Sequence, residues 1–588
     1  MKRTLIDDVT EQIGSQLTVQ GWVHNRRDHG GLIFIDLRDH TGLLQLVINP
    51  DNFELFELAA SLRDEYVIEA VGAVKQRESH LQNDKLASGT VELVVEGIRT
   101  LNKAETLPIQ IHSDQTIGED LRLKYRYLDL RRDKMQNMLK RRAEYYTAIR
   151  SYMGQNDFIE VTTPILANSS PEGARDFLVP SRVHEGKFYA LPQAPQQFKQ
   201  LLMVGGVPRY YQIATCFRDE DPRADRLYGD FYQLDLEMSF VEDGEIVRQT
   251  MEPLIKDLAT NFAGKRLLSE DVPRIPYQEA MDRFGSDKPD LRFDMELIDL
   301  SDVFKTTEFG VFRSAAETGV VKAICVKNGA SLSRSQIDNF TAIAKREGAG
   351  GLAYLTFENG EIKSPIAKFL SGDELQSVRE RMQAEDGDIV FFGADQRTVV
   401  NKVLGRLRSE LADHFDLKDP NVVALAWIVD FPFYEWNDGE KKIDFGHNPF
   451  SMPKGGVEAL ENTEDKLEIT ADQYDMVMNG YEICSGAVRN HNPEVMYKAF
   501  GILGYDEAYV DAKFGALINA FKYGAPPHAG CAFGIDRIFM VLVDETNIRE
   551  VVAFPKNGSG VDVMMDSPSS IEPQLLEELS LKFQPKRP

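Results

Sequence analysis

The sequence has few cysteines and no long hydrophobic run. Its 588 residues hold only four cysteines, and these are scattered without a paired spacing: Cys216, Cys325, Cys484 and Cys531. This pattern excludes a disulfide framework and a cysteine-based zinc site. The longest apolar runs, such as residues 539–543, are far shorter than the roughly 20 residues that a membrane-spanning helix needs. The sequence therefore predicts a protein without a membrane segment.

The chain also lacks an excess of basic residues. It carries 67 Lys+Arg against 93 Asp+Glu, a formal net charge of -26, which argues against a protein that coats DNA. One segment differs, because residues 121–150 hold ten basic and three acidic residues. This segment could contact a nucleic-acid backbone or form a solvated helix face. Acidic residues interrupt the N-terminus at Asp7 and Asp8, before a signal-peptide run can develop, so we expect a cytoplasmic protein.

The first 107 residues have the pattern of a small barrel. Apolar alternation predicts five strands, with one short helix at residues 53–62 and a Thr41-Gly42 turn. Five strands in about a hundred residues are typical of a closed barrel that binds oligonucleotides, the OB-fold. The predicted strands are residues 17–23, 32–37, 43–48, 66–75 and 90–98.

A hairpin with a long polar tip is predicted at residues 210–240. In its second strand the even positions, up to Phe240, are apolar, while Asp235 and Glu237 share the other face. The tip, residues 219–230, is longer than a hairpin needs, and loops of this length are usually functional or disordered.

A further change of pattern follows the Gly-Ser-Asp-Lys-Pro-Asp stretch at residues 285–290. Strand and helix periodicities alternate from there to about residue 416, which predicts a compact α+β insert of roughly 130 residues.

Three short motifs carry the chemistry. A strand ends at Pro164, Phe-Arg-Asp-Glu stands at residues 217–220, and Gly-Ile-Asp-Arg stands at residues 534–537. In this order they resemble the three motifs of the class II aminoacyl-tRNA synthetases, in which arginine forks hold the phosphates of ATP. Longer stretches resemble the bacterial-type aspartyl-tRNA synthetase family; they are residues 21–23, 26–28, 33–39, 170–176, 190–196, 198–203, 285–290, 474–477 and 479–482.

The resemblance implies a multidomain α+β fold. Its parts would be an OB-fold anticodon-binding domain (1–107), a basic hinge (108–135), a catalytic domain on an antiparallel sheet (136–284 and 417–560), an inserted GAD-like α+β domain (285–416) and a C-terminal extension (561–588). In this class the helix and strand of the first motif form a homodimer interface.

The resemblance also assigns site residues, with ATP as a substrate and Mg²⁺ as the metal. Arg218 and Arg537 would be catalytic, and Asp475 and Glu482 would bind Mg²⁺. The aspartate-binding residues would be Glu172, Gln196, Lys199, Arg218, Asp235, His447 and Arg489. The ATP-binding residues would be Arg218, Asp219, Glu220, Glu482, Gly534, Ile535, Asp536 and Arg537.

The choice of tRNA depends on the barrel, where the resemblance places Arg27, His29, Phe34 and Gln45 at the anticodon. In this family, relaxed enzymes that charge both tRNA(Asp) and tRNA(Asn) tend to have histidine at the position of His29, and strict enzymes tend to have leucine. An imidazole can accept different base edges, whereas an aliphatic group can only exclude them. Relaxed charging implies a link to a tRNA-dependent amidotransferase. The alternatives are a strictly discriminating ligase and a His29 that only faces solvent.

The chain departs from the family pattern in three places. Residues 226–231 are one residue longer than usual, with Leu227 where relatives have glutamine; Asn448 replaces a histidine; and Cys484 stands in a run that is usually glycine. None of these removes a charge that the chemistry needs. Two other functions remain open: an asparagine synthetase on the same fold, which the barrel disfavours, and a catalytically silent tRNA-binding protein.

Overall fold

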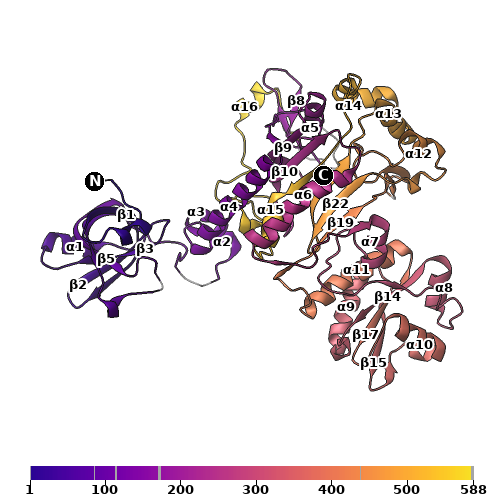
Figure 1. Cartoon of the computed structure of the whole chain (residues 1–588), viewed down its shortest axis with the longest axis horizontal. Helices are drawn as coiled ribbons and strands as arrows, with labels where there is room; N and C mark the ends of the chain where they lie inside the picture. Colours follow the sequence, from indigo (N-terminus) through magenta and orange to yellow (C-terminus); the bar gives the residue numbers. More distant parts are fainter. Residues whose placement is uncertain (1, 85, 113–115, 170–173, 438, 585–588) are drawn as a thin grey trace. The chain divides into compact units, whose positions relative to one another are not determined.

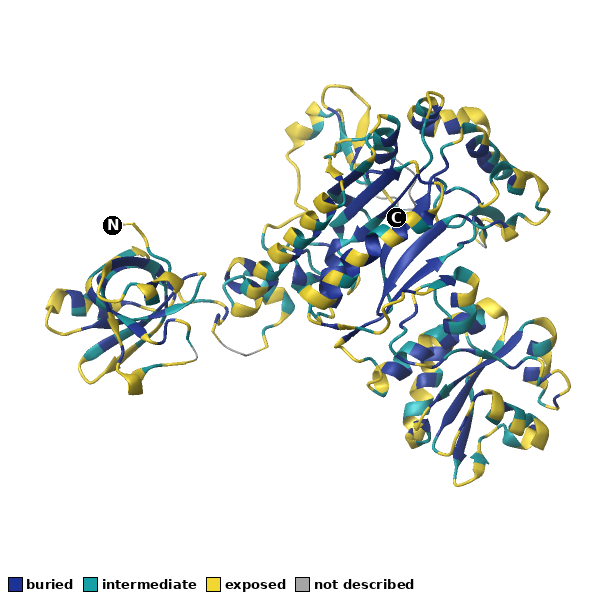
Figure 2. Ribbon diagram, in the orientation of Figure 1, coloured by how far each residue is buried: buried dark blue, intermediate teal, exposed yellow. Residues whose placement is uncertain are grey.

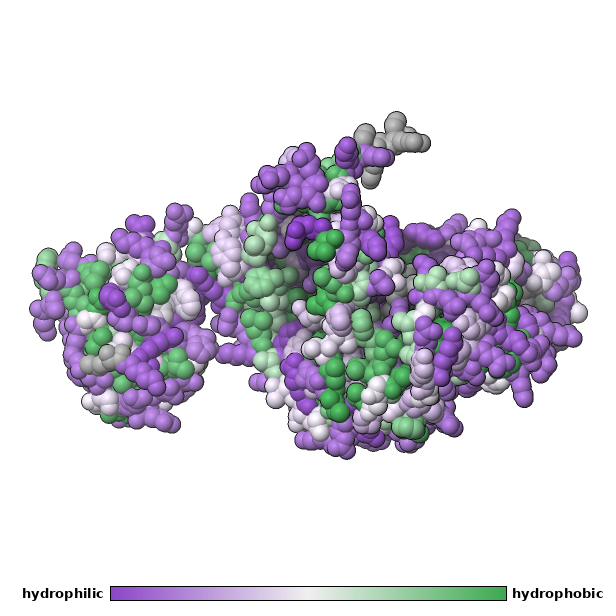
Figure 3. Space-filling view, turned by 90° about the horizontal axis from the view of Figure 1, so that it is seen from above, coloured by the Kyte–Doolittle hydropathy of each residue, from purple (hydrophilic) through white to green (hydrophobic). Residues whose placement is uncertain are grey.

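The computed structural model describes residues 2–84, 86–112, 116–169, 174–437 and 439–584 (Figure 1). Its contacts divide the chain into two compact units, Met1–Lys140 with Val563–Ser567, and Arg141–Asp562 with Pro568–Pro588. Hydrophilic side chains cover most of the face shown in Figure 3, with hydrophobic patches between them. Within the described residues, no helix combines the length and apolarity needed to cross a membrane.

The first unit contains the expected five-stranded barrel, closed in the order β1-β2-β3-β5-β4. In β2, Ile33, Ile35 and Leu37 are buried, while Phe34 and Asp36 are only partly buried. This alternation fills the barrel with aliphatic side chains and confirms the predicted OB-fold. The elements are β1 (Gln16–His29), β2 (Leu32–Arg38), β3 (Leu43–Ile48), α1 (Phe53–Ser61), β4 (Val67–Gln76) and β5 (Val91–Asn102).

The basic segment that follows the barrel uses much of its charge inside the protein. It contains α2 (Glu119–Lys124), α3 (Arg126–Asp129) and the start of α4 (Asp133–Gln155). Arg126 and Arg132 donate to the fully buried carboxylate of Asp129, and Arg131 donates to Glu65 of the barrel over 2.9 Å. The net charge of the segment therefore overstates what it can offer to a partner.

The second unit is built on an eight-stranded sheet in the order β12-β19-β22-β23-β24-β10-β9-β6. Its six central strands are antiparallel, and the edge strands β12 and β6 pair in parallel with their neighbours. Figure 2 shows that the central strands are largely buried. The bounds are β6 (Ile159–Glu160), β9 (Arg209–Arg218), β10 (Gly229–Ser239), β12 (Arg274–Pro276), β19 (Leu425–Val429), β22 (Gln473–Met478), β23 (Tyr481–Val488) and β24 (His528–Gly534).

The predicted hairpin is formed by β9 and β10, with Asp235 opposite Gln212. Two details of the prediction are wrong. The tip is shorter, because β10 already begins at Gly229. Phe240 does not pack, since the strand ends at Ser239 and a positive φ of 59° turns Phe240 outward, where it is 79% exposed.

Helices cover this sheet and fill the connections between its strands. The helices used below are α5 (Gln196–Val204), α6 (Gly244–Asp257), α7 (Tyr277–Phe284), α13 (Pro493–Ile502), α14 (Glu507–Phe521) and α15 (Ile535–Leu542). The remaining short elements are β7 (Leu178–Pro180), β8 (Phe188–Ala190), β11 (Arg266–Leu267), β18 (Val422–Val423), β20 (Tyr434–Asn437), β21 (Lys442–Phe445), α12 (Gly456–Asn462) and α16 (Pro573–Glu578).

The insert forms its own antiparallel sheet in the order β13-β14-β17-β15-β16. One face packs against α9 and α11 through residues such as Phe340 and Leu404, and the other against α8 and α10 through Phe312 and Val378. The expected α+β insert is thus present, with two apolar cores of its own. Its elements are β13 (Ile298–Asp299), α8 (Gly310–Thr318), β14 (Val320–Val326), α9 (Arg334–Arg346), β15 (Ala353–Glu358), β16 (Glu361–Lys363), α10 (Gly372–Arg381), β17 (Ile389–Asp395) and α11 (Arg397–His414).

Candidate active site

A pocket with a volume of about 600 Å³ lies over the central strands of the large sheet and gathers most of the predicted site residues. Those that line it are Gln196, Lys199, Arg218, Glu220, Asp235, His447, Asp475, Glu482, Arg489, Gly534, Asp536 and Arg537. Glu172 lies outside the residues that the structure describes. Asp219 and Ile535 are not part of this lining.

The floor of the pocket is a buried cluster of two cations and two carboxylates. Arg489 grips Glu237 with two bonds, Nε to Oε1 over 2.8 Å and Nη2 to Oε2 over 3.1 Å. Lys199 Nζ lies 2.9 Å from Asp235 Oδ2 and 3.5 Å from Glu237 Oε2. All four side chains are at most 2% exposed. A bidentate partner fixes the plane of the Arg489 guanidinium, which leaves its other edge to meet a ligand.

Glu237 is a site residue that the sequence does not predict, although the alternation of β10 puts it on the same face as Asp235. The two carboxylates differ in their surroundings. Burial raises the pKa of Asp235 despite the nearby Lys199. Burial acts on Glu237 in the same direction, but Arg489 and Lys199 hold the pKa of Glu237 below its usual value. Glu237 is thus the charged counterion of Arg489, and Asp235 is the carboxylate that still lacks a full set of partners.

Four buried polar atoms in this pocket have no hydrogen-bond partner within the described part of the chain: Gln196 Nε2, Arg218 Nε, Asp235 Oδ1 and Asp475 Oδ1. Buried polar groups are normally satisfied, and each exception needs an explanation. The set combines two donors with two acidic acceptors. A ligand that carries both anionic and cationic groups would satisfy all of them.

The two arginines that the motifs predict both line the pocket, at what we call its predicted phosphate end. Arg218 ends β9, with its guanidinium carbon 5.0 Å from the centre of the Phe231 ring. Arg537 stands in the first turn of α15, where Nη1 donates to the Glu482 carbonyl over 2.6 Å. Its Nη2 also lies 3.3 Å from the Asp225 carboxylate. Arg537 is therefore held by an internal anion at the position predicted for a phosphate.

Three predicted ATP-binding residues have structural contacts instead of a free position in the pocket. The buried Asp536 pairs with Arg142 of α4 and accepts from the Tyr232 amide over 3.3 Å. Asp219 accepts from the Tyr228 hydroxyl over 3.2 Å. Ile535 is fully buried in α15. Nucleotide contact by these three residues stays a prediction.

Asp475 and Glu482 stand on the neighbouring strands β22 and β23, as a site for Mg²⁺ requires. Burial and then the carboxylate of Glu482 raise the pKa of Asp475 well above its usual value, with a smaller contribution from Asp287. Among the described residues, no group of three or more histidine, cysteine or acidic side chains is arranged to hold a metal by itself. The carboxylates of Asp475 and Glu482 are hard oxygen donors, and Asp475 Oδ1 has no partner among the described residues. They fit a Mg²⁺ ion that substrate phosphates would also bind.

His447 lines the pocket, with Nε2 3.7 Å from Glu435 Oε1. The three departures from the family pattern are also placed there. Leu227 and Cys484 line the pocket, and the longer loop is braced by Lys556, whose Nζ lies 2.6 Å from Asp230. Asn448 lines the pocket and accepts from the Phe450 amide over 2.9 Å.

In the other unit, the predicted anticodon residues share the outer face of the barrel. Phe34 pairs in register with Arg27, and Asp36 pairs with Gln45. Phe34 therefore belongs to a surface and not to the core, as its partial burial also shows. His29 is exposed at the end of β1, next to a turn of two glycines with φ of 60° and 81°.

Comparison with known proteins identifies the family. Residues 118–558 match the family model for tRNA synthetases class II (D, K and N), and residues 17–101 match that for the OB-fold nucleic acid binding domain. A relative from Chlorobium phaeobacteroides, named aspartate–tRNA(Asp/Asn) ligase, is 51% identical over 575 residues, 98% of this chain and 94% of the relative. A protein of the same name from Rickettsia canadensis is 50% identical over 97% of this chain and 96% of its own length.

Solved structures agree on the fold. The asparaginyl-tRNA synthetase of Pyrococcus horikoshii matches with a TM-score of 0.55 and 19% identity, over 94% of this chain and 98% of that one. The aspartyl-tRNA synthetase of Entamoeba histolytica matches with a TM-score of 0.56 and 19% identity, over 95% and 92%. With the matched family model spanning most of the second unit and an anticodon-binding barrel before it, this chain belongs to the class II tRNA synthetases of the aspartate, lysine and asparagine group.

Proposed function

We propose that this chain attaches L-aspartate to tRNA(Asp), and also to tRNA(Asn), through an aspartyl-adenylate made from ATP. The observation that carries the proposal is the buried floor of the pocket, where Arg489 and Lys199 stand beside Asp235. An amino acid with two carboxylates and an ammonium group needs cations at two places and an anion at a third. The curated relatives carry the name of an aspartate ligase for both tRNAs, which supports this choice of substrate.

The amino acid is held by charge and by geometry. Arg489, oriented by Glu237, and Lys199 receive the side-chain carboxylate of aspartate, which an amide of the same shape cannot replace. We assign the ammonium end to Asp235 Oδ1, and the family resemblance adds Gln196, which would accept there through its amide oxygen. His447 and Glu172 complete the set as predictions from the family resemblance.

In the first step, an α-carboxylate oxygen of aspartate attacks the α-phosphorus of ATP in line. The bond to the bridging oxygen breaks, and pyrophosphate leaves with the electron pair. In this proposal Arg218 bridges the carboxylate and the α-phosphate, and Arg537 binds the γ-phosphate. Glu220 contacts the adenine after releasing Arg226, its partner over 2.5 Å. Mg²⁺, held by Asp475 and Glu482, would neutralise charge on the phosphates. Positioning and preformed charges supply the catalysis, without a nucleophile from the protein.

In the second step, a hydroxyl oxygen of the terminal ribose of the tRNA attacks the carbonyl carbon of the adenylate. The mixed anhydride bond breaks, AMP leaves with the electron pair, and the hydroxyl loses its proton to the departing phosphate, so that aspartate is joined to the tRNA as an ester. The barrel selects the tRNA by contacts of its outer face with unstacked anticodon bases.

The contact between Arg537 and Asp225 gives a first prediction. Asp225 pairs with the Arg537 guanidinium that would bind the γ-phosphate, so the two anions compete for it. Asp225→Asn should therefore lower the KM for ATP by about two- to fivefold, the effect expected from the loss of a partly exposed ion pair. Steady-state pyrophosphate exchange at varied ATP measures this. Asp221→Asn, in the same loop, serves as the control. An unchanged or raised KM for ATP in Asp225→Asn would show that the contact does not compete with the nucleotide.

The tRNA specificity gives a second prediction. Exposed His29 at the tip of the β1–β2 hairpin should let the wild-type protein charge both purified tRNAs with labelled aspartate. His29→Leu should reduce charging of tRNA(Asn) more than that of tRNA(Asp), because an aliphatic group cannot bond to the third anticodon base. If the wild-type protein ignores tRNA(Asn), the strictly discriminating alternative holds and the aspartate assignment stands.

Charging of tRNA(Asn) with aspartate has a consequence for the cell. A tRNA-dependent amidotransferase must convert the product to asparaginyl-tRNA, and we expect the protein to work in the cytoplasm with the rest of translation. The two other functions are tested by the same assay. An asparagine synthetase would release free asparagine in the presence of ammonia, and a silent tRNA-binding protein would form no ester.

A third prediction concerns assembly. Apolar side chains are unusually exposed around β6, β7 and β8; they include Ile159 (49%), Leu166 (51%), Leu178 (61%) and Val183 (74%). A patch of this kind marks an interaction site, and a second copy of the chain would cover it as an isologous interface. Sedimentation at micromolar concentration should therefore give a dimer, about twice 66.4 kDa. A single species of 66.4 kDa would contradict the homodimer.

A further inference from the structure

The chain enters the inserted domain through a segment that passes the catalytic pocket. This segment, residues 274–297, comprises β12, α7 and the Gly-Ser-Asp-Lys-Pro-Asp loop at 285–290. Asp287 and Lys288 of the loop line the pocket together with Arg489 and Arg537. Neither residue takes part in the two reaction steps of the proposed function.

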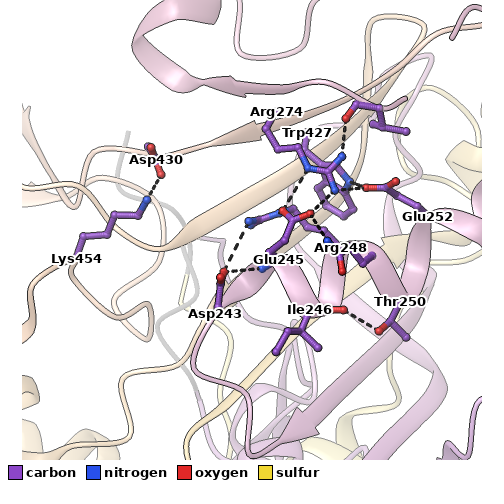
Figure 4. Close-up of polar contacts among 12 residues, drawn as sticks. Asp243, Glu245, Ile246, Arg248, Thr250, Glu252, Arg274, Trp427, Asp430 and Lys454 are labelled. Atoms are coloured by element: carbon purple, nitrogen blue, oxygen red, sulfur yellow. Dashed lines mark hydrogen bonds and ion pairs between the residues drawn. The ribbon is translucent and has the colours of Figure 1, made fainter. Parts of the chain in front are cut away.

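The start of the segment is fixed to the catalytic domain. Figure 4 shows Arg274 of β12 between two carboxylates of α6, with its Nη2 2.5 Å from Glu245 and 2.5 Å from Glu252. Trp427 of β19 donates to the same Glu252 oxygen over 3.0 Å. Two carboxylates shared between neighbouring elements leave β12 little freedom to shift.

The far end of the segment is fixed by the inserted domain. Arg408 of α11 is 4% exposed and donates three bonds to backbone carbonyls, to Asp290 over 2.8 Å, to Phe293 over 3.0 Å and to Met295 over 3.0 Å. Its guanidinium carbon also lies 4.1 Å from the centre of the Phe293 ring. Because the buried, planar guanidinium of Arg408 binds three carbonyls of residues 290–295, it fixes the backbone path of that stretch.

Contacts between α7 and α11 hold the loop at its beginning. Gly285 has a φ of 68°, and a Cβ there would lie 2.2 Å from the Asn401 carbonyl of α11. Lys322 of β14, only 1% exposed, donates to Asp282 of α7 over 2.8 Å and to Asn401 over 2.9 Å. The inserted domain thus touches the segment on both sides of Asp287 and Lys288.

The loop in turn packs against the turn between β22 and β23, the two strands that carry the proposed metal ligands. A Cβ on Gly480, in the turn before Glu482, would lie 3.3 Å from the Asp290 Cβ. The Asp290 carboxylate is held by Arg292 over 2.7 Å. A shift of the 290–295 backbone would therefore move Asp287 and Lys288 relative to the phosphate end of the pocket.

We propose that the inserted domain sets the position of the 285–290 loop in the catalytic pocket, with Arg408 as the positioning residue, so that Lys288 meets the phosphates of ATP and Asp287 adds an acidic oxygen beside Asp475. The inference rests on the proposed function. It gives the insert a part in adenylate formation, although the insert forms a sheet and two cores of its own.

The first test compares Arg408→Lys with Arg406→Lys in aspartate-dependent pyrophosphate exchange, normalised to active sites titrated by adenylate formation. Arg406 stands on the same helix, 55% exposed and paired with Glu410, so this control makes the same substitution without the buried contacts. Arg408→Lys should raise the KM for ATP by about tenfold or more, the scale expected when a binding group is misplaced by a fraction of an ångström to 1 Å. Arg406→Lys should stay within about twofold of wild type.

A folded Arg408→Lys protein with wild-type KM values for ATP and aspartate overturns the inference. Wild-type protein without exchange overturns the proposed function instead, so the two failures are distinguishable. A purely structural Arg408 would lower the titratable fraction and the melting temperature without changing the KM per active site.

A second variant keeps the test valid if Arg408→Lys does not fold. Lys288 is exposed and Asp287 partly exposed, so Asp287→Asn with Lys288→Met should fold, and it should also raise the KM for ATP. If Arg408→Lys does fold, it should add little in this background, because residues that act through one contact are not additive. Wild-type kinetics of the Asp287→Asn, Lys288→Met protein would overturn the inference.

Discussion

Arg489→Leu should raise the KM for aspartate by at least about a hundredfold, since breaking one partner of a buried ion pair costs about 3–5 kcal/mol. Two anions lose their cation at once in this variant. The substrate carboxylate finds no fork, and Glu237, which is fully buried, loses both bonds to the guanidinium. Lys199 alone then faces two carboxylates and the substrate.

Titration with aspartate in pyrophosphate exchange measures this effect, with the KM for ATP as an internal reference that should change little. Arg266→Leu is a matched control, because Arg266 is 67% exposed and pairs only over 3.5 Å with Asp419. Glu237→Gln tests the newly found partner separately and should raise the same KM by a smaller factor, since an amide accepts less strongly from Arg489. A wild-type aspartate KM in Arg489→Leu would refute the pocket assignment.

Arg218→Ala should reduce the rate constant of adenylate formation by about 10²- to 10³-fold, the range seen when one preformed donor to a developing charge is removed. Arg218 ends β9 and its buried Nε has no partner in the described residues, so its guanidinium is available to an α-phosphate that changes charge during the attack. Single-turnover formation of adenylate measures the step without the following transfer.

Arg218→Lys separates charge from shape. Lysine keeps the positive charge and loses the planar fork, so we expect a rate between wild type and Arg218→Ala. Both variants should keep the buried cluster at the floor of the pocket intact. In that cluster Arg489 and Lys199 are paired with Glu237 and Asp235, and not with Arg218. An Arg218→Ala protein that forms adenylate at the wild-type rate would remove this arginine from the mechanism.

Local patterns in the sequence predicted the barrel, the β9–β10 hairpin and the alternating insert, because each depends on neighbours within a few residues. The apolar alternation around Ile33 and Ile35 faces the barrel core as expected. The same reasoning failed at Phe240, where a change in backbone φ ends the strand and the alternation has no further meaning.

The contacts that complete the site could not be read from the sequence. Glu237 and Arg489 are 252 residues apart, and Arg408 acts on carbonyls more than a hundred residues before it. The spacing of residues in the sequence does not indicate which distant carbonyl or counterion a side chain will bind. Conversely, the basic run at residues 121–150 is conspicuous in the sequence, yet Arg126, Arg131 and Arg132 are paired with buried carboxylates.

The proposed function depends on one reaction, the formation of aspartyl-adenylate in the pocket that holds Arg489, Arg218 and Arg537. Exchange of labelled pyrophosphate into ATP measures that reaction directly in the purified wild-type protein. We predict exchange that depends on aspartate and on Mg²⁺, and that asparagine does not support. Folded protein that shows no aspartate-dependent exchange, or that responds equally to asparagine, would contradict the account.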